Sequence, residues 1–145
     1  MDSAEARRLI AALDAGLAEV YPPDQRFGPN LRPAHLADGQ GEFFVAREAG
    51  EAVGCGAIRI LDPTTAEVKR MYVDPARRGQ GIGRAILGRL EETAGDIGVT
   101  RLVLETGIHQ AAAIALYRAA GFVEVGCWGE YASSPSSICF AKSLD

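Results

Sequence analysis

Apolar side chains recur every three or four positions between residues 2 and 20, which predicts an amphipathic helix at the start of the chain. Asp2 or Ser3 would cap this helix, and Glu5 is placed to complete a capping box with Asp2. The face that packs on the core would consist of Ala6, Leu9, Ile10, Leu13 and Leu17.

A polar stretch punctuated by proline and glycine follows, as far as Gly41. Tyr21-Pro22-Pro23 ends the first helix, and Pro33, at a first-turn position, opens at most a short second one. A loop of this kind can shape a pocket.

Three segments of strand character come next, at about 42–47, 52–61 and 66–73. The connections at 48–51 and 62–65 are short enough for hairpins, so we expect an antiparallel meander.

The second half of the chain alternates between helix and strand patterns. A helix after Gly81 leads, near Gly98, into a strand at 101–106, and a strand–helix–strand unit of this kind is parallel and right-handed. A further helix at 110–120 would end with Gly121 as a left-handed residue, before strands near 122–131 and 138–142. The inner face of the helix after Gly81 would hold Ile82, Ala85, Ile86, Leu90, Ala94 and Ile97.

This order of elements implies an α/β fold with a mixed sheet and helices on both faces. A length of 145 residues with 48% hydrophobic residues suits one globular domain, residues 1–145. A net charge of −4 argues against generic binding of nucleic acid, which needs a basic surface. Charges and glycines interrupt every apolar segment, so we expect no membrane span.

The cysteines and histidines predict neither a disulfide framework nor a metal site. Cys55, Cys127 and Cys139 are odd in number and lack Cys-x-x-Cys spacing, and no cleavable leader precedes them. We therefore expect a reduced, cytoplasmic protein whose cysteines are small hydrophobic residues of the strands. His35 and His109 are isolated, so we assign no metal.

The most informative segment is a basic, glycine-rich turn between a strand and a helix, at residues 77–84. A dinucleotide fingerprint needs Gly-x-Gly-x-x-Gly, but the third position falls on Arg84 or Ile86 in the two available registers. No Gly-Lys-Ser or Gly-Lys-Thr occurs, which excludes a nucleoside-triphosphate loop. The pattern that remains, Arg78-x-x-Gly81-x-Gly83, predicts a seat for a pyrophosphate at a helix N-terminus.

This pattern resembles the pyrophosphate loop of the GNAT superfamily of N-acetyltransferases, Gln/Arg-x-x-Gly-x-Gly/Ala. The stretch from Gln110 to Phe122 resembles a second family segment, Asn-x-x-Ala-x-x-Leu-Tyr-x-x-x-Gly-Phe, with Gln110 where asparagine is more usual. The resemblance covers about 43–125. It implies the single-domain GNAT fold, a mostly antiparallel sheet of about six to seven strands with a central parallel pair that splays apart.

The resemblance also implies acetyl-CoA as cosubstrate. Main-chain groups of Met71 and Val73, around Tyr72, would hold the pantetheine arm in the splayed cleft, and an N–H near Met71 would face the thioester carbonyl. Gln110 would bond to the coenzyme arm. The pyrophosphate would be bound by Arg78, Gly79, Gln80, Gly81, Ile82, Gly83 and Arg84.

An enzyme of this family transfers the acetyl group to a primary amine by direct attack. Matching the Leu-Tyr-x-x-x-Gly-Phe segment puts the phenol of Tyr117 near the sulfur, as general acid. Glu67 is the first candidate for the base and Glu105 the second. The alternatives are that Tyr117 only packs in the core, and that Glu67 is an exposed strand carboxylate that balances Lys69 or Arg70, in which case Glu105 or no protein group is the base.

The acceptor would be a small-molecule or peptide amine. Its pocket should be walled by residues 21–41 and 127–137, with Arg32, Trp128 and Tyr131 as candidate contacts. Two other functions stay open: a regulatory module that binds acetyl-CoA without turnover, and a nucleotide-binding enzyme. The apolar final strand, 138–141, could pair in a homodimer, although ordinary sheet packing explains it too.

Overall fold

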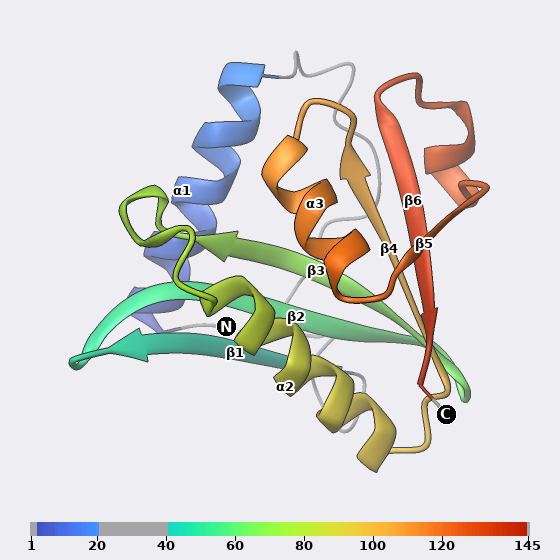
Figure 1. The fold of residues 1–145 in the computed structure, drawn as a ribbon, viewed down its shortest axis with the longest axis horizontal. Helices are drawn as coiled ribbons and strands as arrows, with labels where there is room; N and C mark the ends of the chain where they lie inside the picture. Colours follow the sequence, from blue (N-terminus) through green and yellow to red (C-terminus); the bar gives the residue numbers. More distant parts are fainter. Residues whose placement is uncertain (1–2, 21–40, 145) are drawn as a thin grey trace.

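Within the described residues, one helix comes first, and a three-stranded meander follows whose last strand begins a strand–helix–strand unit; a third helix and two more strands complete the order (Figure 1). The computed structural model describes residues 3–20 and 41–144. The elements are α1 (Ala4–Val20), β1 (Gly41–Glu48), β2 (Glu51–Asp62), β3 (Thr65–Val73), α2 (Ile82–Asp96), β4 (Arg101–Gly107), α3 (Ala111–Ala119), β5 (Val123–Val125) and β6 (Ser137–Ser143). The predicted meander and the alternation that follows it are confirmed.

The six strands form one mixed sheet in the order β1-β2-β3-β4-β6-β5. Every neighbouring pair is antiparallel except β3 and β4, which are parallel as predicted. The connection between these two strands runs through α2, and a crossover of this length is what parallel pairing requires.

Helix α1 begins where the side-chain oxygen of Ser3 accepts a hydrogen bond from the backbone N–H of Ala6, at 3.0 Å. The predicted capping box joins Glu5 to Asp2, which lies outside the described residues; the carboxylate of Glu5 binds the guanidinium of Arg47 on β1. A guanidinium is a stronger partner for a carboxylate than a backbone N–H. The predicted short helix at Pro33 lies outside the described residues.

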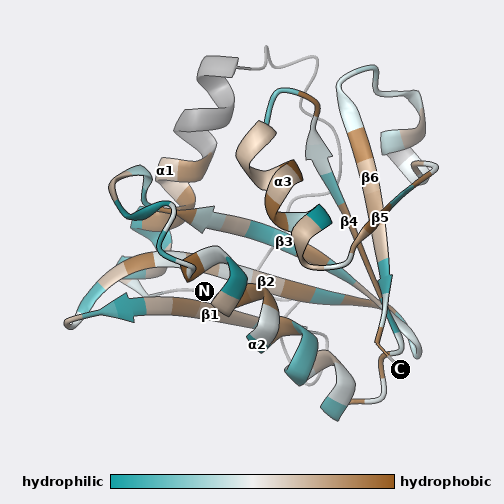
Figure 2. Ribbon diagram, viewed as in Figure 1, coloured by the Kyte–Doolittle hydropathy of each residue, from teal (hydrophilic) through white to brown (hydrophobic). Residues whose placement is uncertain are grey.

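Helices cover both faces of the sheet. On one face, Leu9 of α1 packs in a cluster with Ala52, Cys55 and Tyr72. The larger core lies on the other face, between the sheet and helices α2 and α3. In Figure 2, α2 carries hydrophobic and hydrophilic positions along its length, as an amphipathic helix does. None of the described helices is long and apolar enough to cross a membrane.

The buried face of α2 differs in part from the predicted one. Ile86, Leu90 and Ala94 are buried as expected, and Leu87 is buried with them. Ala85 is exposed and Ile97 is 50% exposed, so both assignments were wrong. Ile97 follows the last helical turn, where the chain no longer keeps the helical period.

The predicted strand at 122–131 is also largely wrong. Strand β5 ends at Val125, and the chain then forms a 3-10 turn at Gly129–Ser133. Gly129 has a φ of 54°, a left-handed conformation that interrupts an extended chain.

A disulfide joins Cys127 to Cys139, with the Cα atoms 5.3 Å apart. The expectation that all three cysteines are reduced is therefore wrong for these two, and the cytoplasmic assignment loses that support. Val125, two residues before Cys127, lies opposite Cys139 in the β5–β6 pairing, so the chain beyond β5 passes close to Cys139. Cys55 is a buried free thiol.

Candidate active site

The parallel strands β3 and β4 are paired at one end only. Their register pairs run from Thr65–Arg101 to Glu67–Val103, although β3 continues to Val73 and β4 to Gly107. Beyond Glu67 the two strands diverge (Figure 1). Backbone groups that face this cleft have no neighbouring strand to bond with, and an amide-rich ligand can pair with them instead.

A β-bulge shapes the β3 side of the cleft. Cys55 pairs with Tyr72 but Ala57 pairs with Lys69, so Arg70 and Met71 together oppose a single residue of β2. Arg70 has a φ of 57°, and its carbonyl accepts a hydrogen bond from the Cys55 thiol at 3.2 Å. Burial raises the pKa of Cys55 to about 12, so this thiol keeps its proton.

The bulge also decides which side chains face α2. The extra residue shifts the alternation of β3, so that Met71 and Val73 join the core face that Val68 occupies. The residue opposite the bulge is Gly56, where a Cβ would lie 2.7 Å from the Met71 sulfur and 2.6 Å from Ile86. The sequence contains no signal for the bulge that we can identify besides this glycine.

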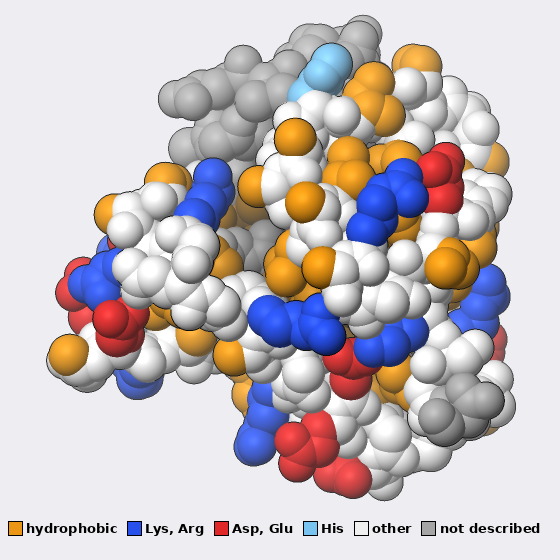
Figure 3. Space-filling view, in the orientation of Figure 1, with side chains coloured by type: hydrophobic (Ala, Val, Ile, Leu, Met, Phe, Trp, Pro, Cys, Tyr) orange, Lys and Arg blue, Asp and Glu red, His pale blue; other side chains and the backbone are white. Residues whose placement is uncertain are grey.

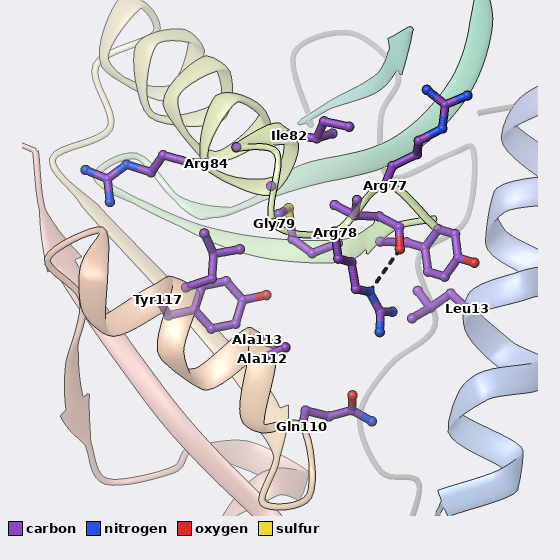
Figure 4. A pocket seen from close by; sticks show the side chains of 16 residues that line it. Leu13, Arg77, Arg78, Gly79, Ile82, Arg84, Gln110, Ala112, Ala113 and Tyr117 are labelled. Atoms are coloured by element: carbon purple, nitrogen blue, oxygen red, sulfur yellow. Dashed lines mark hydrogen bonds between the residues drawn. The ribbon is translucent and has the colours of Figure 1, made fainter. Parts of the chain in front are cut away.

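A cavity of about 300 Å³ opens between the bulged segment of β3, the glycine loop and α3 (Figure 4). It brings together eleven of the twelve predicted cosubstrate residues, which are Met71, Tyr72, Val73, Arg78, Gly79, Gly81, Ile82, Gly83, Arg84, Gln110 and Tyr117. Gln80 is exposed and does not line the cavity. Leu13 of α1, Ala112, Ala113 and Leu116 line it without having been predicted.

Glycine is required in the loop for two different physical reasons, one at Gly79 and Gly81 and another at Gly83. Gly79 and Gly81 have φ values of 83° and 81°, and a Cβ on either would meet open space. They serve the left-handed backbone that turns the chain into α2. Gly83 is helical, and a Cβ there would lie 2.9 Å from Leu116, so this glycine allows α2 and α3 to approach closely.

The N-terminus of α2 can hold an anion. Gly81 is its N-cap, no side chain of the described residues caps the first turn, and that turn contains no acidic residue. The first backbone N–H groups of a helix and its dipole both attract negative charge. The glycine loop and the N-terminus of α2, together called the anion cradle, therefore fit the diphosphate of a coenzyme.

Of the three arginines around the loop, Arg78 points into the cavity, while Arg77 and Arg84 extend away from its centre (Figure 4). The Nε of Arg78 donates to the carbonyl of Val73 at 3.3 Å. Arg77 forms ion pairs with Glu48 at 3.0 Å and Glu51 at 3.3 Å. Figure 3 shows basic and acidic side chains interspersed on this face, so the positive charge near the loop is local.

Tyr117 extends from α3 with its hydroxyl toward the cavity (Figure 4). Its ring packs against Phe122 at 5.9 Å and Phe140 at 6.2 Å between centroids. Burial raises the pKa of Tyr117, and the nearby charge of Glu105 raises it further. The phenol therefore carries its proton at neutral pH and can donate it.

Glu67 lies on the opposite face of the sheet from Tyr117. Its neighbours in β3, Ala66 and Val68, pack in the core under α2, and alternation turns Glu67 the other way. The carboxylate is 2% exposed and accepts a hydrogen bond from the Tyr131 hydroxyl at 3.1 Å. The alternative of an exposed strand carboxylate is thus wrong.

Glu105 is on β4, two residues past the last pairing with β3. Alternation places it on the same face as Glu67, because Leu102 and Leu104 face the core. Its carboxylate accepts a hydrogen bond from Ser137 at 2.6 Å. Burial raises the pKa of Glu105, and the Ser137 hydrogen bond and the Lys69 charge partly oppose this.

The predicted acceptor residues are only partly accounted for. Arg32 lies outside the described residues. Trp128 is partly buried and contacts Tyr131 edge-on, with ring centroids 5.4 Å apart. Tyr131 itself is buried at 4% exposure, and its contact with Glu67 had no signal in the sequence, since 64 positions separate the two.

Known proteins are similar to this chain in sequence and in architecture. The model of the Acetyltransferase (GNAT) family matches residues 10–122. The chain is 44% identical to the IAA acetyltransferase of Azospirillum brasilense, over 94% of this chain and 89% of that protein. It superposes with a TM-score of 0.83 on a proposed acyl-CoA N-acyltransferase from Klebsiella pneumoniae, with 39% identity over 99% of this chain and 92% of the other.

A GNAT family acetyltransferase from Elizabethkingia anophelis, solved with acetyl-CoA bound, shares the fold at a TM-score of 0.62 and 22% identity. That likeness covers 81% of this chain and 94% of the other. Since the family model spans most of the sequence and the Azospirillum protein is similar over nearly all of it, the chain belongs to the GNAT family and is an acetyl-CoA-dependent N-acetyltransferase.

Proposed function

We propose that the protein transfers the acetyl group of acetyl-CoA directly to a primary amine of a small molecule or peptide, with both substrates bound at once. The observation that carries this proposal is one cavity, in which the glycine loop, the bulged segment of β3 and the Tyr117 phenol meet. Acetyl-CoA supplies an acetyl group activated as a thioester. The loop and the N-terminus of α2 would hold its diphosphate, and the divergent edge of β3 its amide arm.

Three groups of the chain would then act on the reaction. A main-chain N–H near Met71 would donate to the thioester oxygen as negative charge develops there. Tyr117 would donate to the sulfur as it departs, for which its raised pKa keeps the phenol protonated. Glu67 would accept the proton of the amine from the other face of the sheet.

The proton acceptor must help to remove a proton from the acceptor amine. An alkylamine has a pKa of ~10, so its deprotonation at neutral pH costs about 4 kcal/mol. Glu67 is four residues before Met71 on β3, which at ~3.3 Å per residue is at most about 13 Å, and the bulge at Arg70 shortens this length. We therefore propose that Glu67 acts through water. Glu105, on the same face, is the competing candidate.

An acceptor screen tests the proposal. Acetyl-CoA is incubated with a panel of primary amines that includes amino acids, peptides, polyamines and aminoglycosides, and free thiol is followed. IAA, the compound in the name of the Azospirillum relative, belongs on the same panel. Amine-dependent thiol release is expected, whereas saturable binding without any such release would contradict the proposal.

Tyr117→Phe is the matched variant for the acid role, because it keeps the ring that packs on Phe122 and Phe140. We expect a roughly tenfold to thousandfold loss of kcat, with the KM for acetyl-CoA changed little. A variant with wild-type kcat would leave Tyr117 with a packing role alone.

A further inference from the structure

Tyr131 reaches a charged pair on β3 from the connection between β5 and β6. Its hydroxyl lies 3.1 Å from Glu67 Oε2 and 3.2 Å from Lys69 Nζ. An ammonium group can only donate, so the phenol oxygen accepts from Lys69. The single phenolic proton is thereby directed to Glu67. The order of donation is Lys69 to Tyr131 to Glu67.

The turn that carries Tyr131 is held in several ways. The Cys127–Cys139 disulfide ties its start to β6. The N–H of Tyr131 donates to the Trp128 carbonyl at 3.0 Å, and its own carbonyl accepts from Ser134 at 3.1 Å. The Trp128 ring packs edge-on against the Tyr131 ring. The disulfide, the turn hydrogen bonds and the Trp128 ring together hold the Tyr131 phenol in position beside Glu67.

Other charges also face Glu67 within the described part of the chain. Arg59 of β2 is its direct cross-strand partner, and such partners share a face. Glu105 of β4 lies close enough for the charge of Glu67 to help raise the pKa of Glu105. Lys69 lies on β3 and Tyr131 on the turn. Among these contacts, the Tyr131 phenol is the neutral donor to Glu67.

We propose that Tyr131 is a positioning residue of the acetyl transfer, which acts by holding the Glu67 carboxylate in one orientation. This inference rests on the proposed role of Glu67 as proton acceptor. A hydrogen bond constrains the distance and the angle between its two groups, so a donor that is itself held in place fixes the position of the carboxylate. Tyr131 does not line the cavity that fits the cosubstrate, so it acts through Glu67.

Tyr131→Phe tests the inference, because it removes one hydroxyl and keeps the ring against Trp128. We expect kcat at neutral pH to fall about threefold to thirtyfold, with the KM for acetyl-CoA within twofold of wild type. A loss in kcat without a matching change in this KM is the result expected of a misplaced proton acceptor, whereas a fold defect would change the binding of acetyl-CoA as well.

A double-mutant cycle separates this role from a structural one. In Glu67→Gln, which has no carboxylate to position, adding Tyr131→Phe should change kcat by less than about twofold. An equal loss in both backgrounds, or a rise in the acceptor KM alone, would overturn the inference in favour of a fold defect or a direct contact with the acceptor. Thermal unfolding of each variant accompanies the kinetics.

The cycle also distinguishes failure of the proposed role of Glu67 from failure of the proposed role of Tyr131. If Glu67→Gln has the kcat and pH profile of the wild type, the role of Glu67 fails and the role of Tyr131 fails with it. If Glu67→Gln loses activity while Tyr131→Phe keeps the wild-type kcat, only the inference about Tyr131 is overturned.

Discussion

Arg78 shows how position, rather than charge alone, distinguishes similar residues in this site. Three arginines surround the glycine loop, but Arg77 forms ion pairs with two carboxylates of the β1–β2 hairpin, and Arg84 lines the cavity while extending away from its centre. Arg78 is anchored to Val73 through one nitrogen, and the rest of its fork projects into the space where a diphosphate would lie.

We therefore expect Arg78→Ala to raise the KM for acetyl-CoA about fivefold to fiftyfold, since a charge-assisted hydrogen bond is worth about 1.5–3 kcal/mol before solvent screening. Arg84→Ala should raise this KM less. Arg89→Ala is the control, because Arg89 stacks on Phe44 at 5.4 Å and does not line the cavity. Initial rates at several salt concentrations would measure these effects. Equal KM values for the Arg78 and Arg89 variants would contradict the assignment.

At the scale of one element, two glycines in and just after α2 differ in backbone conformation, so their substitution should have opposite effects on stability. Gly98, just past its C-terminus, has a φ of 90° with open space where a Cβ would be. Gly88 is in the helical interior, also with open space and without a positive φ. The same substitution should therefore have opposite signs at the two positions.

Gly98→Ala should lower the free energy of unfolding by about 1–2 kcal/mol, because an L-residue is strained in a left-handed conformation. Gly88→Ala should raise it by about 0.5–1 kcal/mol, because alanine loses less backbone entropy in a helix. Urea unfolding of both variants measures the two changes. A stabilised Gly98 variant would show that the turn after α2 can be rebuilt with a negative φ.

Element by element, the sequence predicts well what depends on local chemistry. The left-handed Gly121 and the meander follow from residue types and short spacings, and the structure confirms them. The bulge at Arg70, the short β5 and the Cys127–Cys139 pair depend on which strands meet, so short-range patterns do not reveal them. The same holds for Tyr131, whose contact with Glu67 follows from tertiary packing.

At the scale of the whole molecule, charges buried near the cleft link its stability to pH. Burial raises the pKa of Glu105, so the folded protein binds this proton more tightly than the unfolded chain. The stabilisation is fully present below the unfolded-state pKa and is lost as the pH rises through the folded-state pKa. Ionisation of Glu105 therefore destabilises the fold.

Glu105→Gln does not titrate and can still accept a hydrogen bond from Ser137. We expect the melting temperature of this variant, relative to wild type, to be higher at pH 8 than at pH 4. A change of 1 kcal/mol moves the melting temperature of a domain of this size by roughly 2–5 °C, so scans at several pH values can resolve the trend. A constant difference between the two proteins would contradict it.

The limited pairing of β3 with β4 has a mechanical consequence. It divides the sheet into two three-stranded halves, joined in the sheet by three register pairs. One half bears α2 and the anion cradle, and the other bears the aromatic bed of Tyr117. A cosubstrate that contacts both halves links them. The resistance of the two halves to separation and the affinity for the cosubstrate therefore rise or fall together. Substitutions far from the cavity that alter the angle between the halves will then tune binding without touching the ligand.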